Sequence, residues 1–201
     1  MKNRCEWCGN DPLYRDYHDH QWGVPEHDDF KLFEMLCLEG AQAGLSWLTI
    51  LRKRKSYQEV FSNFDFTSIA SYTERDIAAL MTHPGIVKNR LKINAVVKNA
   101  AVVIDIIEEK GNFSSFLWDY VDGVPLQNKW RSMQEVPSQT ELSRRLSRDL
   151  KKRGMSFVGP TICYSLMQSV GMVNDHLVNC FRHQEIQRLS QHQNKGNNLQ
   201  P

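Results

Sequence analysis

Apolar residues recur at the spacing of an α-helix along most of the chain. Residues 28–40, DDFKLFEMLCLEG, start with two aspartates and then place apolar side chains every three or four positions, which is typical of a helix with a buried face. Residues 46–61, SWLTILRKRKSYQEVF, follow the same pattern after Ser46, whose hydroxyl can accept a backbone N–H at an N-cap. We find no convincing run that alternates apolar and polar residues as a half-buried strand does. The pattern therefore predicts an all-α protein.

Two longer segments extend the helical pattern. Residues 84–110 are predicted to form one helix with Pro84 near its first turn, where a missing N–H is tolerated, and its apolar stripe consists of Ile93, Val96, Val97, Ala100, Ile104 and Ile107. Residues 138–154 begin with a capping box from Ser138 to Glu141 and end at Gly154 in the C-cap position, so a second, strongly basic helix is expected there.

A short turn, Val158-Gly159-Pro160, leads from this basic helix into another apolar segment. Gly159 permits a positive φ or a close backbone approach, and we expect Pro160 to start the next helix at its N1 position. A plain helical hairpin explains this stretch. A hairpin that offers backbone N–H groups and a helix N-terminus to a phosphate explains it as well.

The bulk composition is that of an ordinary globular protein, with 201 residues, 41% hydrophobic and 24% charged. No apolar run is long enough to cross a membrane, and the first ten residues lack the apolar segment of a signal peptide. These features predict a cytoplasmic protein, in which five cysteines serve as thiols or metal ligands. We expect one folded unit over residues 1–183, a disordered tail over 184–201, and a monomer.

The net charge of +2 conceals an uneven distribution. Residues 1–39 contain nine Asp and Glu against four Lys and Arg, whereas residues 52–55 and 144–153 are strongly basic. Each basic run alone is most simply a solvated helix face. Together they favour a polyanionic partner such as nucleic acid.

Cysteine and histidine gather near both ends of the chain. His176 and Cys180 are four residues apart, so they would project from one face of a helix. Cys5 and His18 could complete a tetrahedral Cys₂His₂ zinc site, which would be structural because no ligand position stays open. The spacing alone does not choose between His18 and His20, Cys5-x₂-Cys8 is itself a common zinc half-site, and unconnected thiols and surface histidines remain the simplest alternative.

A carboxylate interrupts an apolar segment at residues 37–47, CLEGAQAGLSW. Glu39 ends the apolar run, small residues follow, and Trp47 opens the next helix. A helix–turn–helix corner with a capped glutamate and a core tryptophan would explain this stretch on its own.

These features together resemble a known family. Cys5, DPLYRDYHDHQWG, CLEGAQAGLSW, the hairpin and NDHLVNC, in this order, are similar to the Tag family of 3-methyladenine DNA glycosylases, from about residue 3 to residue 181. The resemblance implies a helix-hairpin-helix glycosylase fold, with the N- and C-terminal segments tied by a structural zinc ion. It also implies removal of 3-methyladenine from alkylated double-stranded DNA.

The resemblance assigns roles to particular residues. It implies that one Zn²⁺ is held by Cys5, His18, His176 and Cys180, with Cys8 outside the family's zinc pattern. It places the base pocket at Tyr14, Tyr17, Trp22, Glu39 and Trp47. It makes residues 157–161 the DNA-binding hairpin, with contacts from Val158, Gly159 and Thr161. Gly44 and Leu45 would fill the gap that a flipped nucleotide leaves.

The chemistry explains why such a pocket needs an acid. Enzymes that act on a base within duplex DNA flip the nucleotide out, stack it on aromatic rings and read its edge by hydrogen bonds. 3-Methyladenine is cationic while attached to the sugar, so a buried Glu39 would favour it over neutral adenine and act as the catalytic residue. Asp175 is a second candidate for assisting hydrolysis, with a helix-capping role as its alternative. Nothing in the sequence suggests a lysine nucleophile, which predicts a monofunctional glycosylase.

Two other classes of protein compete with this interpretation. A non-catalytic, zinc-stabilised DNA-binding module would explain the basic runs, the hairpin and the metal ligands, but not Glu39 and the aromatic set. A zinc hydrolase would need an open coordination position, which four protein ligands exclude.

Overall fold

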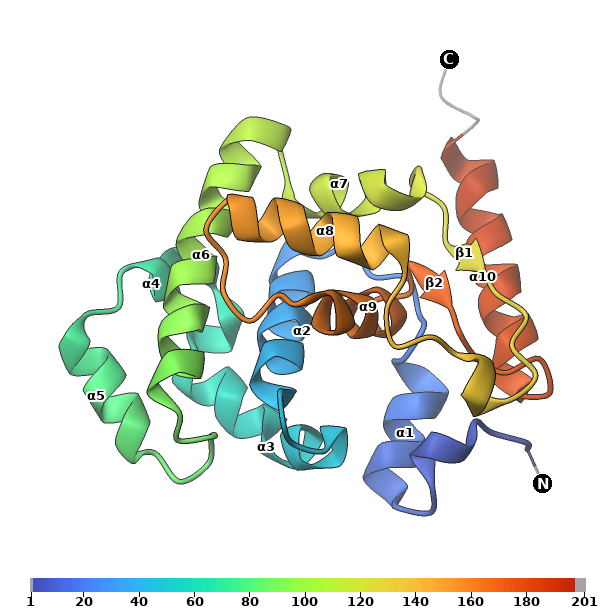
Figure 1. Ribbon diagram of the computed structural model, residues 1–201, viewed down its shortest axis with the longest axis horizontal. Coiled ribbons are helices and arrows are strands. Elements are labelled where there is room, and N and C mark those ends of the chain that lie inside the picture. The colour runs from blue at the N-terminus through green and yellow to red at the C-terminus, as the bar shows by residue number, and fades with distance from the viewer. Residues whose placement is uncertain (1, 198–201) are drawn as a thin grey trace.

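The protein is mostly helical, as its apolar pattern predicts (Figure 1). The computed structural model describes residues 2–197. Its α-helices are α1 (Pro12–His20), α2 (Asp29–Gln42), α3 (Trp47–Val60), α4 (Phe66–Ala70), α5 (Glu74–Thr82), α6 (Arg90–Lys110), α7 (Phe113–Trp118), α8 (Glu141–Lys152), α9 (Pro160–Ser169) and α10 (Phe181–Asn197). Short 3₁₀ turns cover Glu6–Cys8, Ser62–Phe64, Asp119–Val121 and Met133–Glu135.

Two short strands are the exception to the all-helical pattern. β1 (Leu126–Gln127) and β2 (Val173–Asn174) pair in parallel, with Leu126 opposite Val173. Two residues are too few to give an alternating pattern in the sequence. The pair nevertheless matters, because it fixes the segment before α8 against the segment after α9.

Helix boundaries follow local capping chemistry. The Asp28 side chain accepts the N–H of Lys31 at 3.0 Å, and the Ser46 hydroxyl accepts that of Thr49 at 3.2 Å. These two N-caps confirm the predicted starts of α2 and α3. Pro160 is in the first turn of α9, also as predicted.

Two predicted helix starts are wrong. The helix predicted from Pro84 begins at Arg90, because the Asn89 side chain caps the N–H of Lys92. The basic helix begins at Glu141 instead of near Ser138, because Thr140 forms a reciprocal capping box with Ser143.

The prediction of a disordered tail from residue 184 is also wrong for residues 184–197, because these residues belong to α10. Ile186 is fully buried, and the ring of His183 is hydrogen-bonded to the carbonyl of Asn128 at 2.9 Å. One isoleucine and one histidine thus anchor a segment whose composition is otherwise polar. Residues 198–201 of that prediction lie outside the described residues.

Helix α2 passes through the centre of the molecule. Its ten consecutive residues from Leu32 to Ala41 are all buried, and the helix packs against α3, α6, α7 and α9. A helix that is apolar on all sides is expected to be surrounded by others. The carboxyl group of Glu39 therefore lies in the protein interior.

The N-terminal segment lies beside the start of α10. The N–H of Phe181 donates to the carbonyl of Asn3 at 3.0 Å, and the Asn3 side chain donates to the carbonyl of Asn179 at 2.9 Å.

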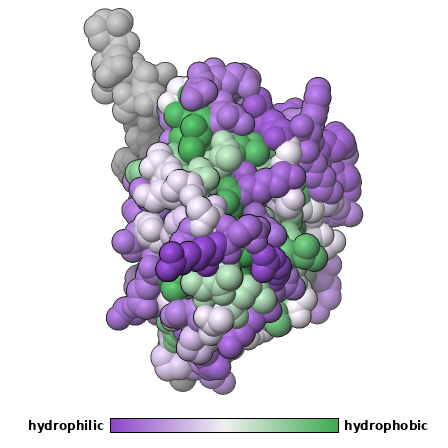
Figure 2. Space-filling view, turned by 90° about the vertical axis from the view of Figure 1, so that its left-hand side faces the viewer, coloured by the Kyte–Doolittle hydropathy of each residue, from purple (hydrophilic) through white to green (hydrophobic). Residues whose placement is uncertain are grey.

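Polar side chains cover most of the face in Figure 2, with apolar groups scattered among them. No helix among the described residues is long and apolar enough to span a membrane.

Candidate active site and metal centre

A cavity of about 210 Å³ opens beside α1, α2 and α9. All five residues that were predicted to bind a base line this cavity. The lining consists of Trp7, Tyr14, Tyr17, Trp22, Glu39, Gln42, Trp47, Met133, Val136, Ser165, Gln168 and Asp175.

Two aromatic rings form one wall of the cavity. The centroids of Tyr17 and Trp47 are 5.5 Å apart, with the rings tilted by 51°. Neither the Tyr17 hydroxyl nor the Trp47 indole N–H has a hydrogen-bond partner of normal geometry among the described residues. Buried polar atoms are nearly always satisfied, so both groups suit a ligand that brings its own donors and acceptors.

Glu39 contributes a buried carboxyl to the same cavity. Only 5% of the residue is exposed. Burial raises the pKa of Glu39 to about 8, although a hydrogen bond with Ser169 opposes this shift. At neutral pH the free protein therefore holds Glu39 as a neutral acid, and a cation in the cavity would favour its ionisation.

Asp175 is a second buried acid that lines the cavity. Its carboxylate accepts hydrogen bonds from the side chains of Asn128 at 2.6 Å, Trp130 at 2.8 Å, Tyr164 at 2.6 Å and Gln168 at 2.8 Å. Four side-chain donors hold it in one orientation, whereas a helix cap would accept backbone N–H groups. The helix-capping alternative is therefore wrong.

A groove of about 190 Å³ adjoins this cavity and shares Glu39, Gln42 and Ser165 with it. It brings together Gly44, Leu45 and Thr161, three of the predicted DNA contacts. Leu45 is 41% exposed although it is apolar. Gly44 has a φ of +77°, so a side chain there would be strained even though the space is open.

The other two predicted DNA contacts lie in the α8–α9 turn and differ from expectation. Val158 is only 1% exposed as a whole residue, and its carbonyl accepts the Ser147 hydroxyl at 2.6 Å, so it is not placed to contact a ligand directly. Gly159 has a φ of −62°, and a Cβ atom added there would meet nothing within 4 Å. The turn does not use a positive φ at Gly159, and its left-handed residue is Phe157, with φ +56°.

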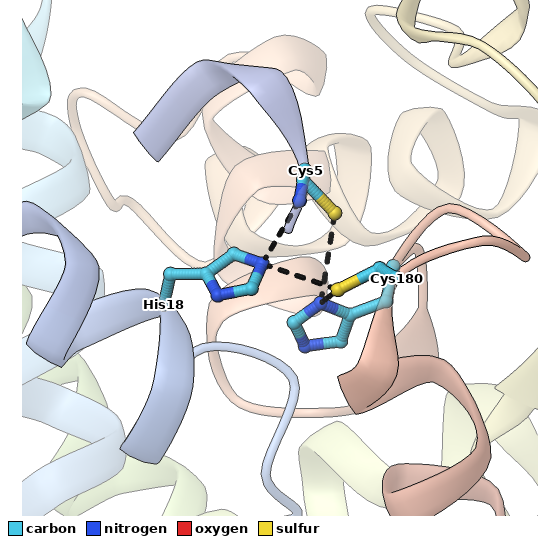
Figure 3. A group of neighbouring side chains, drawn as sticks. Cys5, His18 and Cys180 are labelled. Atoms are coloured by element: carbon cyan, nitrogen blue, oxygen red, sulfur yellow. Dashed lines mark hydrogen bonds between the residues drawn. The ribbon is translucent and has the colours of Figure 1, made fainter. Parts of the chain in front are cut away.

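Cys5, His18, His176 and Cys180 converge in one buried cluster (Figure 3). Their ligand atoms lie within 4.8 Å of one another. Cys5 Sγ is 3.7 Å and Cys180 Sγ 3.6 Å from His176 Nδ1, and Cys180 Sγ is 3.5 Å from His18 Nε2. Ordinary zinc–ligand bond lengths at tetrahedral angles separate sulfur and nitrogen by about 3.6 Å. The donor set and its spacing therefore fit a zinc ion.

The positions of Cys8 and His20 exclude both residues from this cluster. The Cys8 thiol donates to the carbonyl of Cys5 at 3.1 Å and does not join the cluster. His20 is exposed and pairs with Asp16. Of the two histidines, His18 is the one that faces the cysteines.

Surrounding groups orient the cluster, as is usual at metal sites. Asp19 binds His18 Nδ1 at 2.8 Å and is itself held by Arg4. His176 Nε2 is hydrogen-bonded to the carbonyl of Trp22 at 3.0 Å. Because Trp22 lines the cavity, the cluster directly supports the wall of the candidate active site.

Several lining residues were not predicted from the sequence. Gln42 is one helical turn after Glu39, so its shared face could have been anticipated. The Trp7 ring packs against Tyr14 at a tilt of 56°, with centroids 5.0 Å apart, but nothing in the sequence beyond its aromatic character pointed to Trp7. The remaining unpredicted lining residues come from distant segments: Met133, Val136, Ser165 and Gln168.

The first basic run is largely structural. Arg54 forms a two-pronged ion pair with the buried Glu34, at 2.8 and 3.0 Å. Arg52 pairs with Asp11 at 2.7 Å. These two arginines are engaged within the protein, so the run is weaker support for a polyanionic partner than its charge suggested.

The fold and the cavity define a helical protein with an open, aromatic-walled site that contains two buried acids, Glu39 and Asp175. Comparison with known proteins identifies the family more closely. The family model described as methyladenine glycosylase matches residues 7–183, and the chain belongs to this family. The resemblance noted in the sequence is thereby confirmed.

Individual relatives are similar along nearly their whole length. The chain is 49% identical to the DNA-3-methyladenine glycosylase of Haemophilus influenzae, over 90% of this chain and 97% of that protein. It is 48% identical to DNA-3-methyladenine glycosylase 1 of Escherichia coli, over 88% and 95%. A crystal structure of a variant 3-methyladenine DNA glycosylase I in complex with 3-methyladenine superposes with a TM-score of 0.87 at 40% identity, covering 89% of this chain and 96% of that one.

Proposed function

We propose that this protein is a DNA glycosylase that hydrolyses the N-glycosidic bond of 3-methyladenine in alkylated double-stranded DNA. The observation that carries the proposal is the buried Glu39 carboxyl in a cavity walled by aromatic rings. The similarity to proteins named for this activity supports it.

Recognition depends on charge and shape. The methylated base enters the cavity stacked against Tyr17 and Trp47, where a cation over an aromatic face gains about 0.5 to 2 kcal/mol. Its exocyclic amine and ring edge face Glu39, which loses its proton as the cationic base binds. Neutral adenine offers no such charge, so burial of an ionised Glu39 against it stays unfavourable.

The bond that breaks joins N9 of the base to C1′ of the sugar. Its electron pair moves to N9, so the base leaves neutral and positive charge develops on the sugar. The Asp175 carboxylate, oriented by four donors, stabilises that charge. A water molecule then attacks C1′ and gives up a proton, which leaves free 3-methyladenine and an abasic site.

The groove beside the cavity receives the DNA. Leu45 fills the space that the flipped nucleotide vacates, and Gly44 lets the turn approach the duplex. Backbone N–H groups at the start of α9 bind phosphate, with Gly159 and Thr161 at this helix-hairpin-helix contact. A single chain provides all of these parts, so the enzyme acts as a monomer.

Hydrolysis ends the reaction without cutting the strand. A lyase step needs an amine that forms a Schiff base with the sugar. Lysine is absent from the residues that line the cavity in the described part of the chain. The enzyme is therefore monofunctional.

Zinc has a structural role in this proposal. Cys5, His18, His176 and Cys180 would hold one Zn²⁺, which binds two thiolates that could not otherwise lie side by side in the interior. The hydrogen bond with the Cys180 thiolate raises the pKa of Cys5 well above its usual range. These four ligands, with zinc bound, would tie the N-terminal segment to the segment before α10 and so keep Trp22 and Asp175 in place.

The test is to incubate the protein with DNA treated with dimethyl sulfate and to identify the released bases by chromatography. Release of 3-methyladenine with little 7-methylguanine, and intact strands in a gel run without alkali, is the expected result. No released base from folded, zinc-loaded protein would refute the activity. The alternative, a non-catalytic zinc-stabilised DNA-binding module, would then explain the chain better.

A further inference from the structure

Helix α6 contacts both of the loops that flank the candidate DNA-binding groove. In Figure 1 it runs beside the end of α2 and beside the connection between α8 and α9. Two of its polar residues make these contacts, Lys92 and Asn99. They are seven residues apart, so they lie on the same face, two helical turns or about 10 Å from each other.

Lys92 holds the turn that carries Gly44 and Leu45. Its ammonium group donates to the carbonyl of Ala41 at 2.8 Å and to that of Ala43 at 2.7 Å. The first carbonyl belongs to the last turn of α2, where backbone acceptors lack helical partners and a cation is favourable. The second comes directly before Gly44, so the same ammonium group fixes the start of the turn.

Asn99 holds the α8–α9 turn in the same manner. Its amide donates to the carbonyl of Ser156 at 2.9 Å and accepts the N–H of Ser156 at 2.9 Å. Only 4% of the residue is exposed. Two reciprocal hydrogen bonds to one residue mimic a strand pairing, and they fix the backbone just before the left-handed Phe157.

We propose that α6 is a rigid spacer, and that Lys92 and Asn99 are positioning residues that set the distance between the Leu45 turn and the α8–α9 turn. The inference rests on the proposed function. Neither side chain lines the base cavity, so their effect is on how the protein engages duplex DNA. A duplex has fixed dimensions, and two loops can contact it together only at one separation.

The experiment compares Lys92→Met with Lys92→Arg in the full chain. Methionine keeps the length but removes both donors, whereas arginine keeps charge and donors. Lys110→Met, an exposed lysine at the far end of α6, is the matched control. Excision from methylated duplex, melting temperature and quenching of tryptophan fluorescence by free 3-methyladenine are measured for each.

We expect Lys92→Met to slow excision about tenfold, because a displaced Leu45 turn costs about 1.4 kcal/mol of transition-state stabilisation. Affinity for the free base stays within about twofold, because the cavity is unchanged. Lys92→Arg recovers most of the rate, and Lys110→Met behaves like the wild type. Asn99→Leu weakens binding to undamaged duplex and also leaves affinity for the free base unchanged.

A double-mutant cycle with Leu45→Ala tests whether Lys92 affects excision through the turn that carries Leu45. If Lys92 acts through this turn, Lys92→Met costs much less excision rate in the Leu45→Ala background than in the wild type. Independent effects would overturn the proposal, as would a parallel loss of free-base affinity. Inactive wild-type protein would instead refute the proposed function, so the two failures are distinguishable.

Discussion

Replacing Glu39 by glutamine should stabilise the free protein, and increasingly so as the pH rises. In the unfolded chain Glu39 ionises near its usual pKa of 4.5, whereas in the folded protein burial keeps it protonated up to about pH 8. The folded state therefore binds one more proton between these values, and stability falls by about 1.4 kcal/mol per pH unit across the window. The full penalty is about 5 kcal/mol above pH 8, and it is absent in Glu39→Gln.

Urea denaturation at several pH values from 4.5 to 8.5 measures this difference. We expect the stability of Glu39→Gln relative to the wild type to grow steadily with pH and to level off above pH 8. Glu34→Gln is the control, because Glu34 lies on the same helix and is equally buried but pairs with Arg54. Breaking that pair lowers stability by about 3 kcal/mol. Parallel curves for Glu39→Gln and the wild type would show that Glu39 is already ionised in the free protein, and would refute the reasoning.

Three further outcomes follow from the site. Below pH 8 binding of the cationic base releases the proton of Glu39, so kcat/KM for methylated DNA should rise with pH toward 8, and a pH profile of Glu39→Gln should lack this rise. Asp175→Asn should slow single-turnover excision by about 100-fold, since a charge facing the transition state is lost, while fluorescence titration with free 3-methyladenine shows unchanged affinity; equal losses in both would make it a binding residue. Atomic absorption should find one zinc ion per chain in the wild type and none in Cys180→Ser, which should also melt about 10 °C lower by circular dichroism; full zinc content in the variant would contradict the ligand set.

Local chemistry made most of the helices predictable. Asp28 and Ser46 cap their helices as expected, because an N-cap depends on a few neighbouring residues. The start of α8 was misplaced because Ser138 and Thr140 both suit the cap, and only the observed hydrogen bonds with Ser143 decide between them. α10 was missed because its anchoring depends on a distant partner for His183.

The candidate site was predictable where the family resemblance marked it, and less so elsewhere. Tyr17, Glu39 and Trp47 are distant from Asp175 in sequence but share a cavity with it. Trp7, in the turn before α1, and Gln168, in α9, join them only because α1 packs against α3 and α9 packs against α2, which no local pattern records. The contacts of Lys92 depend equally on tertiary packing, since its partners are 49 and 51 residues away.

The central claim is that the cavity holding Glu39 is where the methylated base is bound. A crystal structure of this protein with 3-methyladenine tests it most directly. We predict the base within the cavity, its plane against Tyr17 and Trp47 and its exocyclic amine about 3 Å from the Glu39 carboxyl. A base bound elsewhere, or one in the cavity with its amine turned away from Glu39, would contradict the account.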